Sequence, residues 1–177
     1  MPDTIETSRL ILRPFEEDDA QEAFQWFGDP LVMEFVPGGP DRSIEQTRTR
    51  LSNYRTHQAA HGFSKWIIVE RASSRRIGDS GLLVLDDYGW IDLGFRLARS
   101  SWGHGFATEA GFAWVRVAFG KFQLARLGAF SHQENVASIR VLEKLGFQSE
   151  RRDTVMGMDS IVFALEATST RTGGGPG

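Results

Sequence analysis

Residues 93–110 read LGFRLARSSWGHGFATEA and decide the fold of this chain. The first five, ending at Leu97, have the pattern of a β-strand, and the apolar spacing after the loop predicts a helix that extends to Phe119. Two glycines, Gly103 and Gly105, stand where that helix should begin. The first N–H groups of a helix lack intrahelical acceptors and lie at the positive end of its dipole, and glycine lets a phosphate approach them closely. The segment therefore predicts a site for a pyrophosphate-bearing cofactor, with a plain tight turn as the alternative.

Two other nucleotide-binding motifs do not fit these residues. A dinucleotide fingerprint needs a third glycine at position 108, which is Thr108, and a βαβ unit that usually opens the fold. Here the loop lies in the middle of the chain, after strands expected to be antiparallel. A phosphate loop of the GxxxxGK[ST] kind occurs nowhere in the sequence.

The remaining periodicities predict an α+β protein with a mixed, mostly antiparallel central sheet. Short connections between the three central β runs favour an antiparallel meander. We expect about six to seven strands, at residues 9–13, 66–69, 77–85, 88–97, 124–131, 147–155 and 160–165. About four helices should flank the sheet, at residues 17–28, 43–61, 103–119 and 134–145. Residues 1–166 should form a single domain, followed by a disordered Gly-rich tail at residues 167–177.

Short patterns define the first two helices further. The acidic residues 17–19 are expected in the first turn of the first helix, where the helix dipole favours them. Ser43 and Gln46 have the spacing of a capping box at the start of the second helix. His57 and His61 lie four residues apart, a spacing that can bind metal, but no carboxylate motif accompanies them. We therefore expect a solvated helix face and no metal site.

Composition excludes several classes of protein. The 177 residues are enough for one domain, and cysteine is absent, which removes disulfides, thiolate metal sites and a cysteine nucleophile. A net charge of −3 provides no bulk positive field for nucleic acid. There is no apolar run near the roughly 18 residues of a spanning helix, and the N-terminus lacks the pattern of a signal peptide. We expect a cytoplasmic protein with neither nucleic acid nor membrane as partner.

A second informative segment is residues 132–147, HQENVASIRVLEKLGF. Its apolar residues give a helix with one buried face, and Gly146 has the position of a C-cap glycine. Asn135 and Ser138 are three residues apart near the start, so they lie on one helix face and could point together at a ligand. The alternative is that Asn135 is an N-cap and Ser138 an ordinary first-turn residue.

Together these segments resemble the GNAT superfamily of acetyl-CoA-dependent N-acetyltransferases. The similarity is closest to the branch of RimJ/RimL-type enzymes that acetylate ribosomal-protein N-termini. It extends over roughly residues 5–166 in the family's order and spacing. The residues that carry it are TSRLILR at 7–13, IDLGF at 91–95, WGHGFATEA at 102–110, and NVAS with LGF at 135–138 and 145–147.

The resemblance implies the GNAT fold and transfer of acetyl from acetyl-CoA to a primary amine. A protein or peptide N-terminus is the favoured acceptor, with an aminoglycoside or polyamine as the alternative small amine. A non-catalytic acyl-CoA-binding module is a further alternative, and a homodimer is left open. No metal is implied.

The resemblance also implies which residues contact coenzyme A. The loop at residues 100–105 should surround the pyrophosphate with backbone N–H groups, and the pantetheine arm should pair with the splayed central strand at Phe95 and Leu97. Ser100 stands where the family often has Gln or Arg, so we expect a contact from its backbone only. The full set of expected contacts is Phe95, Leu97, Ser100, Trp102, Gly103, His104, Gly105, Phe106, Ala107, Thr108, Asn135 and Ser138.

With no cysteine, the simplest chemistry is direct attack of the amine on the thioester. The expected proton donor to the thiolate is Ser138, with Asn135 orienting the pantetheine. Asp92 is the first candidate for the base, because the family usually has a carboxylate two residues before the glycine of this strand. For Glu109, stabilisation of the first helical turn is the preferred interpretation. His132 is a minor candidate for the base, because a lone histidine is more often a hydrogen-bonded bystander.

Aromatic residues of the first two helices would flank the acceptor site in this family. Phe24 and Phe27 have helical spacing and are expected in the core. Trp26 and Tyr54 are the candidates for lining the amine site.

Overall fold

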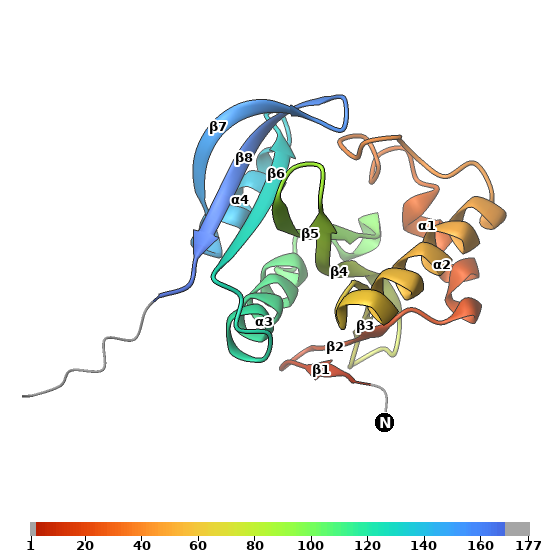
Figure 1. Ribbon diagram of the computed structural model, residues 1–177. Helices are drawn as coiled ribbons and strands as arrows, with labels where there is room; N and C mark the ends of the chain where they lie inside the picture. The colour runs from red at the N-terminus through yellow and green to blue at the C-terminus, as the bar shows by residue number, and fades with distance from the viewer. Residues whose placement is uncertain (1–2, 169–177) are drawn as a thin grey trace, which may run out of the picture.

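The computed structural model describes residues 3–168 and has an α+β fold (Figure 1). Its described residues form one eight-stranded sheet in the order β1-β2-β3-β4-β5-β6-β8-β7. The strands are β1 (Ile5–Glu6), β2 (Leu10–Pro14), β3 (Lys65–Glu70), β4 (Arg76–Leu85), β5 (Trp90–Leu97), β6 (Arg126–His132), β7 (Gln148–Val155) and β8 (Met158–Glu166). The helices are α1 (Ala20–Phe27), α2 (Ile44–His61), α3 (Phe106–Gly120) and α4 (Val136–Lys144), with 3₁₀ turns η1 (Glu17–Asp19) and η2 (Arg99–Ser101).

The α+β class and the central meander β3–β4–β5 predicted from the sequence are confirmed. The expected six to seven strands become eight, because β1 is only two residues long and such a strand leaves no periodicity in the sequence. Most of the tail predicted to be disordered, residues 167–177, lies outside the described residues. Within residues 3–168, no helix combines the length and the apolar character that a membrane crossing needs.

Each face of the sheet carries a hydrophobic core. Side chains of a strand alternate between the two faces, so Trp66 and Ile68 of β3 pack under α3 and α4 while Ile67 packs under α1 and α2. Figure 1 shows α1 and α2 together on one side and α3 and α4 on the other. In the α3 core, Trp66 meets Trp114 edge to face with ring centroids 4.9 Å apart.

The predicted first turn of the first helix is instead the 3₁₀ turn η1. Asp19 is 1% exposed, and its carboxylate accepts two hydrogen bonds of 2.8 Å from the Arg13 guanidinium and one from the Glu16 N–H. Burial alone would raise the pKa of Asp19, but the hydrogen bonds from Arg13 and Glu16 hold it below its ordinary value. The acid therefore ties β2 to the helix start, which a dipole argument does not foresee.

The start of α2 has half of the predicted capping box. Ser43 Oγ accepts from the Gln46 N–H at 3.3 Å, as expected. The Gln46 amide oxygen accepts from the N–H of Arg42 rather than that of Ser43. The helix ends at Gly62, whose φ of +80° suits glycine.

The expectation that His57 and His61 form a solvated face is wrong for His57. Its Nδ1 lies 2.9 Å from the Phe63 carbonyl oxygen, and its Nε2 accepts from the Val84 N–H at 3.0 Å. These two contacts fix a neutral imidazole that connects α2 to β4. The pKa of His57 is lowered, and burial is the largest cause of that shift. Only His61 is exposed.

We predict that His57→Ala lowers the free energy of unfolding by about 1–3 kcal/mol, because the Val84 N–H loses its acceptor. The pKa of His57 is lower in the folded state than in the unfolded chain, so its contribution is complete above pH ~6.5 and is lost as the pH falls through the folded pKa. Urea unfolding between pH 5 and 8 measures both effects. His61→Ala is the control, and an equal loss in both variants would contradict this role.

The sheet opens between β5 and β6. Strand β4 pairs with β5 along all of residues 90–97, whereas β5 and β6 are parallel and share a single pair, Asp92 with Gly128. The Trp90 ring lies on Gly128, where an added Cβ would come within 2.3 Å of the indole. Beyond this point the two strands diverge.

The free edge of β5 faces this opening. The Ala98 N–H donates to the Ile77 carbonyl at 2.8 Å, on the β4 side. Successive residues of a strand direct their backbone groups to opposite sides, so Phe95 and Leu97 present theirs to the β6 side. The backbone groups of these two residues thus face the β6 side without a strand partner.

Candidate active site

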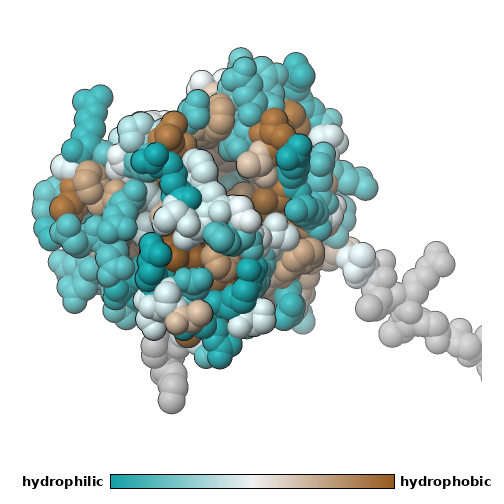
Figure 2. Space-filling view, turned by 180° about the vertical axis from the view of Figure 1, so that it is seen from behind, coloured by the Kyte–Doolittle hydropathy of each residue, from teal (hydrophilic) through white to brown (hydrophobic). Residues whose placement is uncertain are grey.

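A cavity of about 230 Å³ occupies the opening between β5 and β6. Seen from behind, the surface is hollowed near its centre, with hydrophobic residues inside the hollow and mostly hydrophilic ones around it (Figure 2). Of the residues predicted from the sequence, the cavity brings together Asp92, Phe95, Asn135, Ser138 and Tyr54. The rest of its lining is Phe35, Val36, Pro37, Arg50, Lys65, Leu83, Leu85, Leu93, Gly94, Arg96, Phe130, Ser131, Leu142 and Met156.

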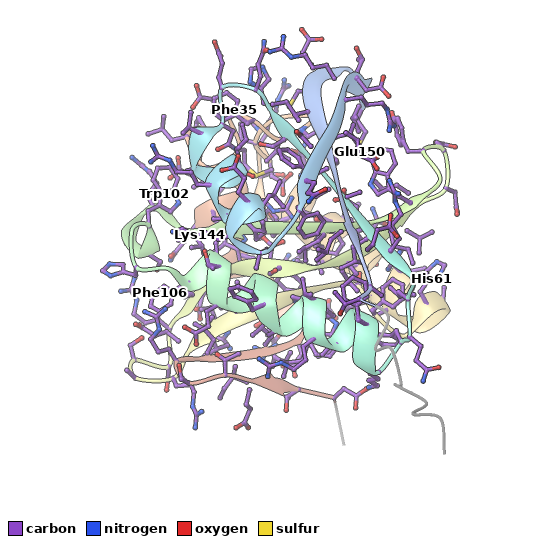
Figure 3. The ribbon with its side chains drawn as sticks, turned by 90° about the vertical axis from the view of Figure 1, so that its left-hand side faces the viewer. Phe35, His61, Trp102, Phe106, Lys144 and Glu150 are labelled. Atoms are coloured by element: carbon purple, nitrogen blue, oxygen red, sulfur yellow. The ribbon has the colours of Figure 1, made fainter. Side chains whose placement is uncertain are left out.

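The glycine loop leads from η2 into α3, close to the helix start that the sequence predicts. Gly103 and Gly105 both have φ of +78°, which an L side chain rarely adopts. Within residues 3–168, no acceptor takes a hydrogen bond from the N–H groups of residues 103–108. Trp102 and Phe106 lie on the side of the molecule where α3 and α4 begin, with Phe35 above them (Figure 3). The helix start can therefore receive an anion.

Arg9 and Glu109 clamp this loop to the N-terminal strands. Glu109 accepts from the Thr7 hydroxyl at 2.5 Å, from the Arg9 N–H at 2.9 Å and from Arg9 Nε at 2.7 Å. Arg9 Nη1 donates to the His104 carbonyl at 2.8 Å, and the guanidinium lies 4.5 Å from the Phe106 ring centroid. Burial opposes ionisation of Glu109, but the hydrogen bonds from Thr7 and Arg9 lower its pKa. These contacts suit a structural carboxylate in the first turn of α3.

Trp102, Leu97 and Ser100 of the predicted contact set also have hydrogen-bond partners within the chain. Trp102 Nε1 donates to the Leu97 carbonyl at 2.9 Å, so of the free strand edge only Phe95 keeps both backbone groups open. Ser100 Oγ accepts from Arg75 Nη2 at 3.3 Å, so its side chain has a partner and its backbone N–H remains the expected contact. Leu97 does not line the cavity itself.

Asn135 and Ser138 combine the two interpretations left open by the sequence. Asn135 is the N-cap of α4, and its Oδ1 accepts from the Ser138 N–H at 3.2 Å. Both side chains also line the cavity. Among the described residues, neither Asn135 Nδ2 nor Ser138 Oγ has a hydrogen-bond partner, so both are free to act on a ligand.

Asp92 lies where β5 and β6 last touch, and it is 7% exposed. Its Oδ1 accepts from Trp90 Nε1 at 3.0 Å. Burial raises the pKa of Asp92 to about 6, against the opposing charge of Lys65. A carboxylate with that pKa is ionised at neutral pH and can accept a proton.

Sequence reasoning missed Lys65, the first residue of β3. It is 5% exposed, lines the same cavity, and its Nζ donates to the Gly81 carbonyl at 3.2 Å. Burial lowers the pKa of Lys65 to about 8. A lysine directly before the apolar run WIIV was the one available signal.

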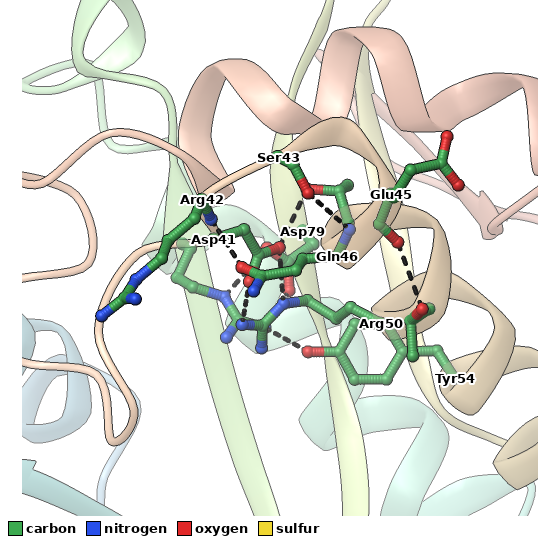
Figure 4. Close-up of polar contacts among 11 residues, drawn as sticks. Asp41, Arg42, Ser43, Glu45, Gln46, Arg50, Tyr54 and Asp79 are labelled. Atoms are coloured by element: carbon green, nitrogen blue, oxygen red, sulfur yellow. Dashed lines mark hydrogen bonds and ion pairs between the residues drawn. The ribbon is translucent and has the colours of Figure 1, made fainter.

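A buried ion pair next to the cavity determines where Tyr54 and Trp26, the two aromatic candidates for the acceptor site, lie (Figure 4). Asp79 is 0% exposed and accepts from Arg96 Nε at 3.0 Å and from Arg96 Nη2 at 2.5 Å. Arg96 Nη2 also donates to the Tyr54 hydroxyl at 3.0 Å, which keeps Tyr54 at the cavity wall. Trp26 is fully buried, does not line the cavity, and donates to Asp79 at 3.0 Å. Phe24 is half-buried, whereas Phe27 belongs to the core.

Two further side chains near the site are Arg50, which sequence reasoning missed, and His132, which it gave as a minor candidate for the base. Arg50 of α2 lines the cavity and pairs with Asp41 at 2.7 Å (Figure 4). The His132 ring stacks on the Phe35 ring with centroids 4.9 Å apart, and His132 Nδ1 accepts from the Glu134 N–H at 3.1 Å. It does not line the cavity, which suits a bystander. Among the described residues, no group of three or more His, Cys, Asp or Glu side chains could hold a metal ion.

A long thioester fits this architecture. The open N–H groups suit its pyrophosphate, the free edge of β5 suits its amide-bearing arm, and a carboxylate and a hydroxyl stand where the strands part. Fold and site together define a transferase that takes its acyl group from coenzyme A.

The family model for the acetyltransferase (GNAT) domain matches residues 9–148, and the chain belongs to this family of acetyl-CoA-dependent N-acetyltransferases. The uncharacterised N-acetyltransferase p20 of Bacillus licheniformis is 30% identical over 149 residues, 84% of each chain. A GNAT acetyltransferase of Bacillus anthracis has a TM-score of 0.82 at 22% identity, covering 93% of this chain and 98% of that one. RimL, a ribosomal L7/L12 alpha-N-protein acetyltransferase, has a TM-score of 0.80 at 16% identity, covering 94% and 96%. The predicted superfamily is thereby confirmed.

Proposed function

We propose that the acetyl acceptor is the N-terminal amine of a protein or peptide, as in enzymes of the RimJ/RimL type. The observation that carries this proposal is the charge of the cavity. Arg50, Lys65 and Arg96 line it, and Asp92 is the one carboxylate among its described lining residues. A polyamine or aminoglycoside brings several positive charges, each of which needs an acidic partner, and the lining offers one carboxylate; a peptide N-terminus brings one charge. The similarity to RimL points the same way.

The apolar part of the cavity supports a peptide acceptor as well. Phe35, Val36 and Pro37 form one wall, and Leu83 and Met156 belong to the lining beyond it. Such walls suit the first side chains of a peptide, whose backbone carbonyls can accept hydrogen bonds from Arg50 or Arg96. A small hydrophilic amine would leave these walls unused.

For the donor, we assign the pyrophosphate to the backbone N–H groups of residues 103–108 and of Ser100. The pantetheine arm is assigned to the free edge of β5 at Phe95 and to the side chain of Asn135. Trp102, with 48% of its surface exposed, stands beside that path. Each assignment rests on a backbone group, or for Asn135 its Nδ2, that has no hydrogen-bond partner among residues 3–168.

Transfer then needs two proton movements. The Asp92 carboxylate takes one proton from the acceptor ammonium, and the freed amine forms the N–C bond at the thioester carbon while the C–S bond breaks. Ser138 gives its hydroxyl proton to the leaving sulfur and regains one from the attacking nitrogen, so that free coenzyme A and the N-acetyl product are neutral at these atoms. Asn135 holds the arm in place.

A thiol-release assay with acetyl-CoA tests the acceptor. Peptides with a free N-terminus should be acetylated, and the same peptides with a blocked N-terminus and no lysine should not. Spermidine and an aminoglycoside are the competitors. Faster turnover of either competitor than of every free peptide would overturn the proposed acceptor class.

We predict that Gly103→Ala raises the dissociation constant of coenzyme A by about tenfold or more. The new Cβ has open space but forces φ of +78° on an alanine, which costs roughly 1–2 kcal/mol and shifts the N–H groups. Gly89→Ala is the matched control, with φ of +77° and equally open space in the β4–β5 turn. Isothermal titration measures both, and equal affinities in the two variants would remove the loop from the binding site.

A further inference from the structure

Two glycines in adjacent strands let Lys65 reach the active site across the sheet. Lys65 of β3 is the register partner of Gly81 of β4, and Gly81 is the partner of Gly94 of β5. Lys65, Gly81 and Gly94 therefore form one row across three strands. The lysine donates to the Gly81 carbonyl at 3.2 Å and extends onward over Gly94.

Lys65 can extend along this row only because Gly94 lacks a side chain. A Cβ built on Gly94 would lie 2.2 Å from Lys65 Nζ and 3.8 Å from Asp92 Oδ2. The ammonium and the carboxylate thus face each other across the bare α-carbon of Gly94. Among the described residues, Gly81 is the one hydrogen-bond acceptor of this nearly buried ammonium, which can donate three hydrogen bonds.

The other charges around Asp92 are already balanced. Arg96 of β5 is paired with Asp79 of β4, and Arg50 of α2 is paired with Asp41. The loop before α2, strand β6, helix α4 and the β7–β8 hairpin add only uncharged residues to the cavity: Phe35, Val36, Pro37, Phe130, Ser131, Asn135, Ser138, Leu142 and Met156. Tyr54 adds a phenol, whose hydroxyl accepts from Arg96. Among the described lining residues, Lys65 is the cation without a salt bridge, and its charge lowers the pKa of Asp92 more than the Trp90 hydrogen bond or the charge of Arg96 does.

We propose that Lys65 is a positioning residue for acetyl transfer, whose ammonium, laid along the Gly81–Gly94 row, keeps the Asp92 carboxylate ionised where the acceptor amine releases its proton. The proposal rests on the proposed role of Asp92 as the base. Lys65 keeps its protons throughout, because the proton taken from the acceptor ammonium stays on Asp92 until it leaves to solvent.

The electrostatics agree with this geometry. Burial alone raises the pKa of Asp92 and lowers that of Lys65, and each charge opposes the shift of the other. Both groups are ionised between about pH 6 and 8. An opposite charge within about 4–6 Å lowers the pKa of a carboxyl by roughly 1–3 units. Removing the ammonium should therefore leave Asp92 protonated over much of that range.

The test is the pH dependence of kcat/KM for Lys65→Met and Lys65→Arg with a saturating concentration of acetyl-CoA. For Lys65→Met, the acidic limb should rise by roughly 1–3 pH units, and kcat/KM at pH 7 should fall by about 2- to 100-fold. Lys65→Arg keeps the charge and should keep the limb near its wild-type position. Lys65→Met leaves Asp92 buried without its cation, but Asp92 should then become protonated, so that no unpaired charge stays buried. Circular dichroism and thermal unfolding check that both variants fold.

Gly94→Ala provides an independent test that leaves every titratable group in place. Its Cβ displaces the ammonium, so the acidic limb should move in the same direction as in Lys65→Met. Gly120→Ala, which adds a Cβ in open space, is the control. If the wild type is active and the acidic limbs of Lys65→Met and Gly94→Ala coincide with that of the wild type, the proposed role of Lys65 is overturned. The proposed function then still stands. If Asp92→Asn retains the wild-type limb, the proposed base fails first.

Discussion

Asp92→Asn is expected to lower kcat by about 100- to 10,000-fold while the affinity for coenzyme A stays unchanged. A positioned base contributes about this factor to proton transfer, and asparagine keeps the shape of the side chain but cannot take a proton. Trp90 Nε1, which donates to Asp92 Oδ1 at 3.0 Å, can still donate to the asparagine oxygen, so the local structure should persist.

The measurement is single-turnover and steady-state acetylation of a free peptide N-terminus. Asp86→Asn, an exposed acid in the β4–β5 turn, is the control and should retain full activity. In wild type, kcat/KM should fall as the pH drops through about 6, because Asp92 is active only when ionised. Wild-type kcat in Asp92→Asn would assign the base to another group or to water.

Asp79→Ala is expected to have the largest effect on stability, a loss of about 3–5 kcal/mol in the free energy of unfolding. The substitution leaves the Arg96 guanidinium buried without its carboxylate and removes the acceptor of Trp26 Nε1. For a chain of this length the melting temperature should fall by about 6–20 °C.

A double variant separates the ion pair from simple packing. Asp79→Leu combined with Arg96→Met removes both charges and should recover part of the loss, because no unpaired charge remains buried. Asp3→Ala is the matched surface control: its pair with Lys121 is more than half exposed on both sides and should contribute at most about 1 kcal/mol. Equal losses in Asp79→Ala and Asp3→Ala would show that the buried network is not a stabilising element.

The parts of the site that are local in sequence were predictable. Gly103 and Gly105 mark a helix start that needs positive φ, and the three-residue spacing of Asn135 and Ser138 fixes their common helix face. Both features follow from backbone geometry within a few residues. Asp92 became the candidate base through the family resemblance, since periodicity alone gives no reason to prefer it over an exposed strand residue.

Features that depend on strand register or on distant partners were not predictable. Lys65 reaches the cavity only because two glycines from other strands lie beside it, and no single segment of sequence contains that row. From its position on α1, Trp26 was a candidate for lining the cavity. Its indole instead donates to the buried acid Asp79, 53 residues away in the sequence, and lies in the core. His57 likewise takes its role from Val84 of another element.

Acetyl-CoA is proposed to bind in the opening between β5 and β6 with its pyrophosphate on the glycine loop. Residue-resolved amide hydrogen exchange with and without coenzyme A tests it most directly. Phe95 and residues 103–108, whose N–H groups have no acceptor among the described residues, should become protected when coenzyme A is added and stay unprotected with NAD. Protection confined to other residues, or no change at saturating coenzyme A, would contradict the claim.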